Sequence, residues 1–140
     1  MKKAFFFLPA VLFLSAQLYS QWVLQPTPTT QNLNSIVYVN ATTLYASGEG
    51  EVILKTTNGG TNWVKLRENI GGKDYLSIWF VNENTGFAAG GLEIPTRTGL
   101  ISKTTNGGVN WVDVVFSDIC FRSAYFINAS TGFKIGRAHV

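Results

Sequence analysis

The sequence predicts an all-β protein built from repeated four-stranded antiparallel sheets, and three observations support this fold class. One segment occurs nearly three times along the chain. After residue 20, short runs of strand-forming residues alternate with glycine and asparagine turns, and helical periodicity is absent. Phe, Trp and Tyr make up 14% of the residues, and 14 glycines accompany only 4 prolines. This composition favours strands joined by tight turns.

The first twenty residues, 1–20, are expected to be a cleaved signal peptide. Lys2 and Lys3 form a positive start, residues 4–16 are apolar, and the next four residues lead to an expected cut before Gln21. The apolar stretch is too short for a typical membrane span, and the alternative is a retained anchor helix. We therefore expect a secreted, periplasmic or cell-surface protein with no membrane span after cleavage.

Removal of this leader leaves a nearly neutral chain. Nine basic and eight acidic residues then remain, which gives a net charge of +1 instead of +3. No basic cluster remains, so nucleic acid is not an expected partner. The single cysteine, Cys120, cannot form an intrachain disulfide, and its apolar neighbours predict a core residue rather than a reactive thiol.

The period of the repeat matches one blade of a β-propeller. The motif Ser-Ile-Val-Tyr-Val-Asn at 35–40 returns in related form at 77–82 and at 123–128, which gives spacings of 42 and 46 residues. Trp63 and Trp111, at the end of a second repeated motif, lie 48 residues apart. One four-stranded blade needs about 40–50 residues.

The blades follow in order along the chain. Blade one is predicted over 34–67, with strands at 34–40, 43–47, 51–57 and 61–67. Blade two is predicted over 75–116, with strands at 75–82, 86–90, 99–105 and 109–116. A partial blade three follows at 120–136. The prediction is therefore an incomplete propeller over 21–136, with about two and a half blades.

Two further expectations concern the ends of the chain. Trp22 precedes the first copy at nearly the spacing that Trp63 and Trp111 have to the copies after them. Residues 21–25 are therefore predicted to be a closing strand that completes the blade at the other end of the ring. Residues 135–140 match one translated frame of a widely used sequencing adapter, so we expect a non-native tail and no role for His139.

The turn between the third and fourth strands is predicted to be closed by its own side chains. Asn-Gly-Gly at 58–60 and 106–108 permits positive φ. Asparagine and the threonine two residues earlier can bond the turn's backbone, and a tryptophan covers the hairpin. The predicted structural residues are Thr56, Asn58, Gly60 and Trp63 in blade one, and Thr104, Asn106, Gly108 and Trp111 in blade two.

The spacing Thr-x-Asn-x-Gly-x-x-Trp at 56–63 and 104–111 resembles the Asp-box, or bacterial neuraminidase (BNR) repeat. Asn replaces Asp in both copies and keeps the acceptor oxygen. The longer unit resembles the propeller repeats of the photosystem II assembly/stability-factor type. The resemblance covers 21 to about 136 and implies the fold, whereas one fold can host many functions.

Our leading functional hypothesis is an exported, non-catalytic propeller that serves as a binding or assembly scaffold for a protein or glycan partner. The loop at 92–98 carries an insertion unique to blade two, and Glu93 and Arg97 are its predicted contact residues. A tolerated surface insertion is the simpler interpretation of the same loop.

Two alternatives remain open. Some propellers with Asp-boxes are sialidases or endoglucanases, so a carbohydrate-active hydrolase with its catalytic residues in further blades is the first, and an adhesin segment is the second. Asp74 and Asp118 come nearest to the carboxylate pair of a glycosidase, but we expect solvated loop acids. No cofactor is expected, and Glu49 and Glu51 are too few for a calcium or other metal site.

Overall fold

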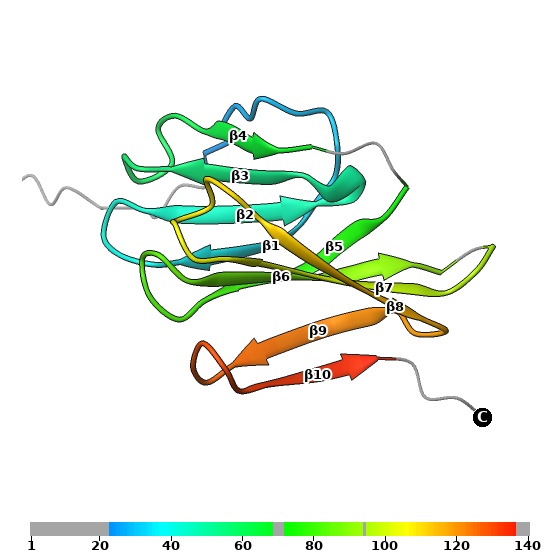
Figure 1. Ribbon diagram of the computed structural model, residues 1–140. Coiled ribbons are helices and arrows are strands. Elements are labelled where there is room, and N and C mark those ends of the chain that lie inside the picture. The colour runs from blue at the N-terminus through cyan, green and yellow to red at the C-terminus, as the bar shows by residue number, and fades with distance from the viewer. Residues whose placement is uncertain (1–22, 69–71, 94, 137–140) are drawn as a thin grey trace, which may run out of the picture.

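The computed structural model describes residues 23–68, 72–93 and 95–136. They form three antiparallel sheets that lie side by side (Figure 1). In each sheet the strands follow the order of the chain, so that every strand pairs with its sequence neighbour. This is the up-and-down arrangement of propeller blades, and the predicted all-β fold class is confirmed.

The strand boundaries lie close to the predicted ones. Blade one consists of β1 (Leu33–Tyr38), β2 (Leu44–Gly48), β3 (Ile53–Thr56) and β4 (Val64–Arg67). Blade two consists of β5 (Asp74–Phe80), β6 (Gly86–Leu92), β7 (Thr98–Thr104) and β8 (Val112–Ser117). The partial blade three consists of β9 (Phe121–Phe126) and β10 (Gly132–Gly136). The fourth strands begin three residues later than predicted, because the Asn-Gly-Gly turns extend to the tryptophans.

The predicted third strand of blade one began too early. Glu49–Glu51 forms a single 3₁₀ turn, and β3 starts at Ile53. Glu51 has a φ of 56°, in the left-handed region that few residues other than glycine adopt. Its backbone N–H donates to the carbonyl of Lys73 at 3.0 Å, and its carboxylate contacts Arg67 at 2.6 Å. Contacts with distant residues therefore hold a conformation that the local sequence does not favour.

The predicted leader and parts of both predicted ends lie outside the described residues. These are 1–20, residues 21 and 22 of the closing strand, and residues 137–140 of the tail. Residues 23–25 form no strand here, and the closing role of residues 21–25 stays a prediction. Ile135 and Gly136 belong to β10, where Gly136 pairs with Phe121.

Blades one and two share the same irregularity in the pairing of their first two strands. The pairing of strand one with strand two shifts register between Leu33 and Ser35 in blade one and between Tyr75 and Ser77 in blade two. Strand two carries a glycine opposite each shift. A Cβ added at Gly48 would lie 2.0 Å from the Asn32 carbonyl oxygen, and one added at Gly90 would lie 1.9 Å from that of Asp74. Only glycine fits this close approach.

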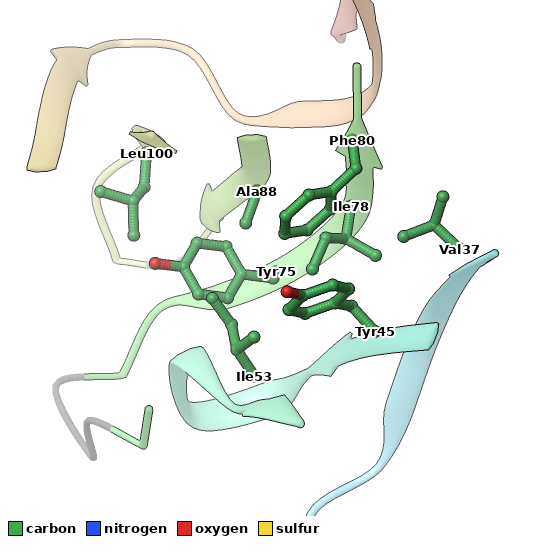
Figure 2. Packing of buried hydrophobic residues seen from close by; sticks show 8 residues of the cluster. All are labelled: Val37, Tyr45, Ile53, Tyr75, Ile78, Phe80, Ala88 and Leu100. Carbon is green, nitrogen blue, oxygen red and sulfur yellow. The ribbon is translucent and has the colours of Figure 1, made fainter. Parts of the chain in front are cut away.

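The hydrophobic core lies between the blades. Figure 2 shows the residues buried between blades one and two: Val37, Tyr45, Ile53, Tyr75, Ile78, Phe80, Ala88 and Leu100. A second cluster between blades two and three contains Ala89, Phe121 and Ala124. Each blade therefore buries apolar surface against its neighbour, the main stabilising contribution in a repeat protein.

Cys120 lies at the start of blade three and is 2% exposed. Burial raises the pKa of its thiol, which keeps the thiol protonated and poorly nucleophilic.

Candidate functional site

The polar side chains that recur in the two Asn-Gly-Gly hairpins bind the backbone of their own turns. In blade two, Thr104 Oγ1 donates to Asn106 Oδ1 at 3.0 Å and accepts the N–H of Gly108 at 2.9 Å. Asn106 Oδ1 also accepts the N–H of Asn110 at 2.9 Å. In blade one, Thr56, Asn58, Gly60 and Asn62 make the same contacts. These polar groups are occupied within the turn.

The tryptophans that end the hairpins lie against apolar clusters. The indole N–H of Trp111 donates to the Gly108 carbonyl at 3.1 Å, and its ring packs against the core between blades one and two. Trp63 packs on Ala46, Val52 and Leu54. Six of the eight residues of the two motifs hydrogen-bond within their own hairpins, and both tryptophans pack on apolar clusters.

The hairpin of blade two also contacts blade one. The Gly107 carbonyl accepts hydrogen bonds from the Tyr45 hydroxyl at 2.8 Å and from Lys55 Nζ at 3.3 Å. A polar hollow of about 220 Å³ lies beside this contact, with Asn40, Glu83 and Asn106 among its lining residues. Asn40 Nδ2 donates to Glu83 Oε1 across it at 2.6 Å.

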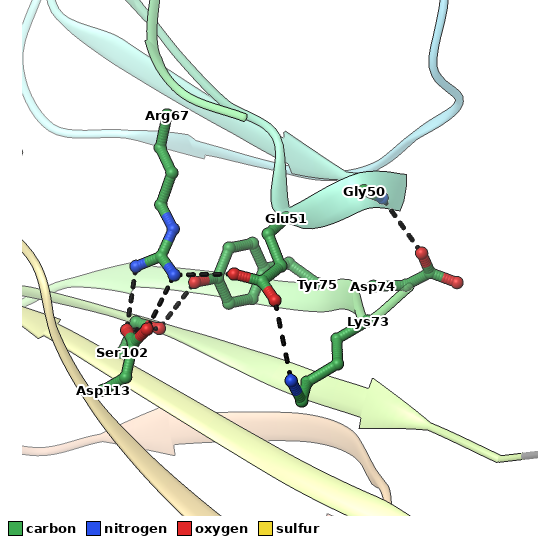
Figure 3. A network of polar contacts seen from close by, with 8 residues as sticks. All are labelled: Gly50, Glu51, Arg67, Lys73, Asp74, Tyr75, Ser102 and Asp113. Atoms are coloured by element: carbon green, nitrogen blue, oxygen red, sulfur yellow. Dashed lines mark hydrogen bonds and ion pairs between the residues drawn. The ribbon is translucent and has the colours of Figure 1, made fainter. Parts of the chain in front are cut away.

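A second polar cluster joins the same two blades, and Figure 3 shows it. Arg67 at the end of β4 donates to both carboxylate oxygens of Asp113 on β8, at 2.8 and 2.7 Å, and to Glu51 at 2.6 Å. Hydrogen bonding to Asp113 raises the pKa of Arg67, and the same contact lowers the pKa of Asp113. Lys73 Nζ lies 4.0 Å from Oε1 of Glu51, whereas Arg67 contacts Oε2 of the same carboxylate.

The proton positions in this cluster follow from the donors available. Ser102 Oγ donates to Asp113 Oδ1 at 2.6 Å, because an ionised carboxylate can only accept. The hydroxyl of Tyr75, 2.5 Å from Ser102 Oγ, must then be the donor in that contact. Burial raises the pKa of Tyr75, whose side chain is fully buried, so the phenol stays neutral.

This cluster of a tyrosine, an arginine and two carboxylates forms a contact between blades one and two. The tyrosine is inaccessible, and the carboxylates are already bound to Arg67. The motifs in the sequence did not predict this cluster. In the sequence, the cluster is marked by a difference between the two copies of the repeat: Ser102 and Asp113 of blade two occupy the positions of Leu54 and Lys65 in blade one.

The insertion of blade two lengthens the β6–β7 hairpin, whose pairing continues to Leu92 and Thr98 (Figure 1). Glu93 forms an ion pair with Arg122 of β9 at 2.5 Å, and the Arg122 side chain is 53% exposed. The carbonyl of Arg97 accepts the N–H of Asp118 at 2.9 Å. The structure thus connects Glu93 to blade three, and the backbone of Arg97 to the segment between blades two and three. Arg122 was not among the predicted contact residues.

The two acids considered as a glycosidase pair have different surroundings. Asp74 is not a solvated loop acid: it begins β5, is half-buried, and accepts the N–H of Gly50 at 3.0 Å. Asp118 is exposed and has a φ of 62°. Over residues 23–68, 72–93 and 95–136, no three His, Cys, Asp or Glu side chains gather in a way that could hold a metal ion. No helix in this part of the chain is long and apolar enough to cross a membrane.

The stacked four-stranded sheets define the fold as that of a β-propeller. Among solved structures, the chain is similar to one described as "YCF48 bound to D1 peptide", with a TM-score of 0.65 and 18% sequence identity. The match covers 80% of this chain and 36% of that chain. No family model matches the sequence. The curated proteins contain no match either.

Proposed function

We propose that this chain belongs to an exported, non-catalytic β-propeller scaffold that binds a peptide segment of a protein partner. The observation that carries the proposal is the long β6–β7 hairpin, which extends from the blades and is held at its base by Glu93–Arg122 and by Arg97–Asp118. Propellers bind partners through the loops at their faces. The structure similar in fold has a peptide bound to it, which supports a peptide as the partner.

The charges at the hairpin suit a polar contact. Glu93 and Arg122 are 32% and 53% exposed, so their ion pair gains little in free energy and can be exchanged for contacts with a partner. By contrast, Glu51 is 2% exposed and is bound by Arg67, so it is not available to a ligand. The hairpin therefore offers accessible charges on an element with a fixed base, which limits the entropy lost on binding.

The proposal is tested by panning the mature chain, residues 21–140, against a display library of short random peptides. Peptides enriched on the wild type should bind the double variant Glu93→Ala/Arg122→Ala about tenfold or more weakly. The matched control is Lys65→Ala/Glu68→Ala, which removes an ion pair of similar length and exposure on β4 and the residue after it. Its peptide affinity should equal that of the wild type.

Two results would contradict the proposal: no peptide is enriched, or the enriched peptides bind both double variants equally. Release of sugar from sialosides or β-glucans by the same preparation would instead favour the hydrolase alternative.

A further inference from the structure

The last strand of blade two has a strand neighbour on one side only. β8 ends the sheet order β5-β6-β7-β8, so it pairs with β7 alone. Successive residues of an antiparallel strand direct their backbone groups alternately to its two sides. Within residues 23–68, 72–93 and 95–136, no strand pairs with the outward backbone groups of β8. This free edge lies at the rim of the sheet, and not on the faces that pack against the neighbouring blades.

The corresponding edge of blade one has three features that oppose further pairing, and β8 lacks them. β4 is four residues long, carries Lys65 and Arg67, and shifts register against β3. β8 is six residues long and pairs with β7 over six consecutive positions without a shift. Its one charged side chain, that of Asp113, is bound by Arg67. Natural sheets protect free edges with short strands, basic side chains and bulges, so β8 is the unprotected edge of the two.

A complete neighbouring blade does not cover the valines at this edge. Val115 is 57% exposed. It pairs with Leu100 of the core between blades one and two, so it lies on the side of the four-stranded blade one. Val112 is 70% exposed on the opposite side. Its counterpart Val64 is 62% exposed, although Val64 lies on the side of blade one that blade two covers.

We propose that β8 binds an extended peptide segment of a protein partner as a fifth strand of blade two. The peptide backbone bonds the outward groups of β8, and its alternate apolar side chains cover Val112 and Val115. This contact is separate from the one proposed for the β6–β7 hairpin.

The size of the edge favours a peptide over a second copy of this chain. A strand of six residues is about 20 Å long and a sheet is about 10 Å thick, so pairing along this edge buries on the order of 400 Å² in total. Stable interfaces between folded proteins bury about 1,200 Å² or more. A single added strand needs no larger surface, because its main-chain hydrogen bonds supply the affinity.

The test is panning of a random-peptide display library on the Glu93→Ala/Arg122→Ala variant of the mature chain, residues 21–140, so that the hairpin charges are absent from the bait. Enriched peptides should bind about tenfold or more weakly when Val115→Lys is added, because a basic side chain at a free edge opposes pairing. The matched control adds Val64→Lys, a similarly exposed valine on the protected strand, and should bind as tightly as the bait. Failure here leaves the hairpin proposal to its own test on the wild type.

Backbone pairing is tested on the peptide itself. The tightest peptide is made in two versions, N-methylated at alternate residues, which keep every side chain. A strand donates to one neighbour from alternate residues only, so one version should lose binding and the other should retain it. Far-ultraviolet circular dichroism shows whether each protein variant retains its β structure.

Three results would overturn the proposal: no peptide is enriched on the bait, the two lysine variants bind equally, or the two N-methylated versions bind alike. A wild-type chain that sediments as a dimer, and that Val115→Lys makes monomeric, would instead assign this edge to a second copy.

Discussion

Arg67 of blade one and Asp113 of blade two form a two-pronged ion pair, with N–O distances of 2.8 and 2.7 Å. The pair joins the fourth strands of two blades that otherwise meet mainly through apolar side chains. Arg67 also binds Glu51, whose side chain is only 2% exposed. One guanidinium therefore neutralises a carboxylate on each side of the junction.

Replacing Arg67 with alanine should lower the free energy of unfolding by about 2–3 kcal/mol, because Glu51 stays buried without the guanidinium. The loss is smaller than for a wholly unpaired charge, since Lys73 remains 4.0 Å away. Urea denaturation measures it. Lys65→Ala is the control: it breaks an exposed pair with Glu68 and should cost about 0–1 kcal/mol. Equal losses in the two variants would contradict the structural role given to Arg67.

The stability of the protein should fall in acid partly through Asp113. Its pKa is lowered in the folded state by the hydrogen bonds from Arg67. A carboxyl with a lowered folded pKa stabilises fully above its unfolded value, about 3.9, and loses that contribution as the pH falls through the folded value. Asp113→Asn should be less stable than the wild type at neutral pH, and the difference should narrow toward about pH 3. Urea midpoints across this range would show it, and a constant difference would count against the ion pair.

The Asn-Gly-Gly turn should accept aspartate in place of asparagine. Asn106 acts through Oδ1, which accepts bonds from Thr104 and from the Asn110 N–H, and an aspartate oxygen can accept both. Asn106→Asp should therefore change the free energy of unfolding by only about 0.5 kcal/mol, whereas Asn106→Leu should cost about 1–2 kcal/mol. Thermal denaturation compares the two. If aspartate is as destabilising as leucine, the Oδ1 contacts do not hold the turn.

Export should remove the first twenty residues. The full chain expressed in a bacterium with a secretory pathway should appear outside the cytoplasm and begin at Gln21. Intact-mass measurement of the purified protein identifies the first residue. Replacing two apolar residues of the leader, Leu12→Arg and Leu14→Arg, should keep the protein unprocessed in the cytoplasm. A retained residue 1 in the exported wild type would favour the anchor-helix alternative.

Local features of the structure were predictable from sequence. The hydrogen bonds that the Thr104 and Asn106 side chains make in this hairpin join residues at most four positions apart, so a short motif is enough to predict them. The repeat likewise places strands, because one period supplies one blade.

Contacts between blades were not predictable in the same way. Arg67 and Asp113 are 46 residues apart and occupy different positions in the repeat, so no spacing indicates that they meet. The position of Glu51 depends on Lys73 and Arg67, which override the extended conformation expected locally. The length of the loop at 92–98 indicated an insertion, but only the fold shows that Glu93 reaches Arg122.

Among the sheets formed by residues 23–68, 72–93 and 95–136, only blade two packs against another sheet on both faces. Amide hydrogens of β6, in the middle of the assembly, should exchange with solvent most slowly, and protection should decline outward toward β4 and β10. Blades one and three both pack on blade two. A substitution that unfolds blade two should therefore destabilise both neighbours, whereas one that unfolds blade one or blade three should leave the other two blades packed together.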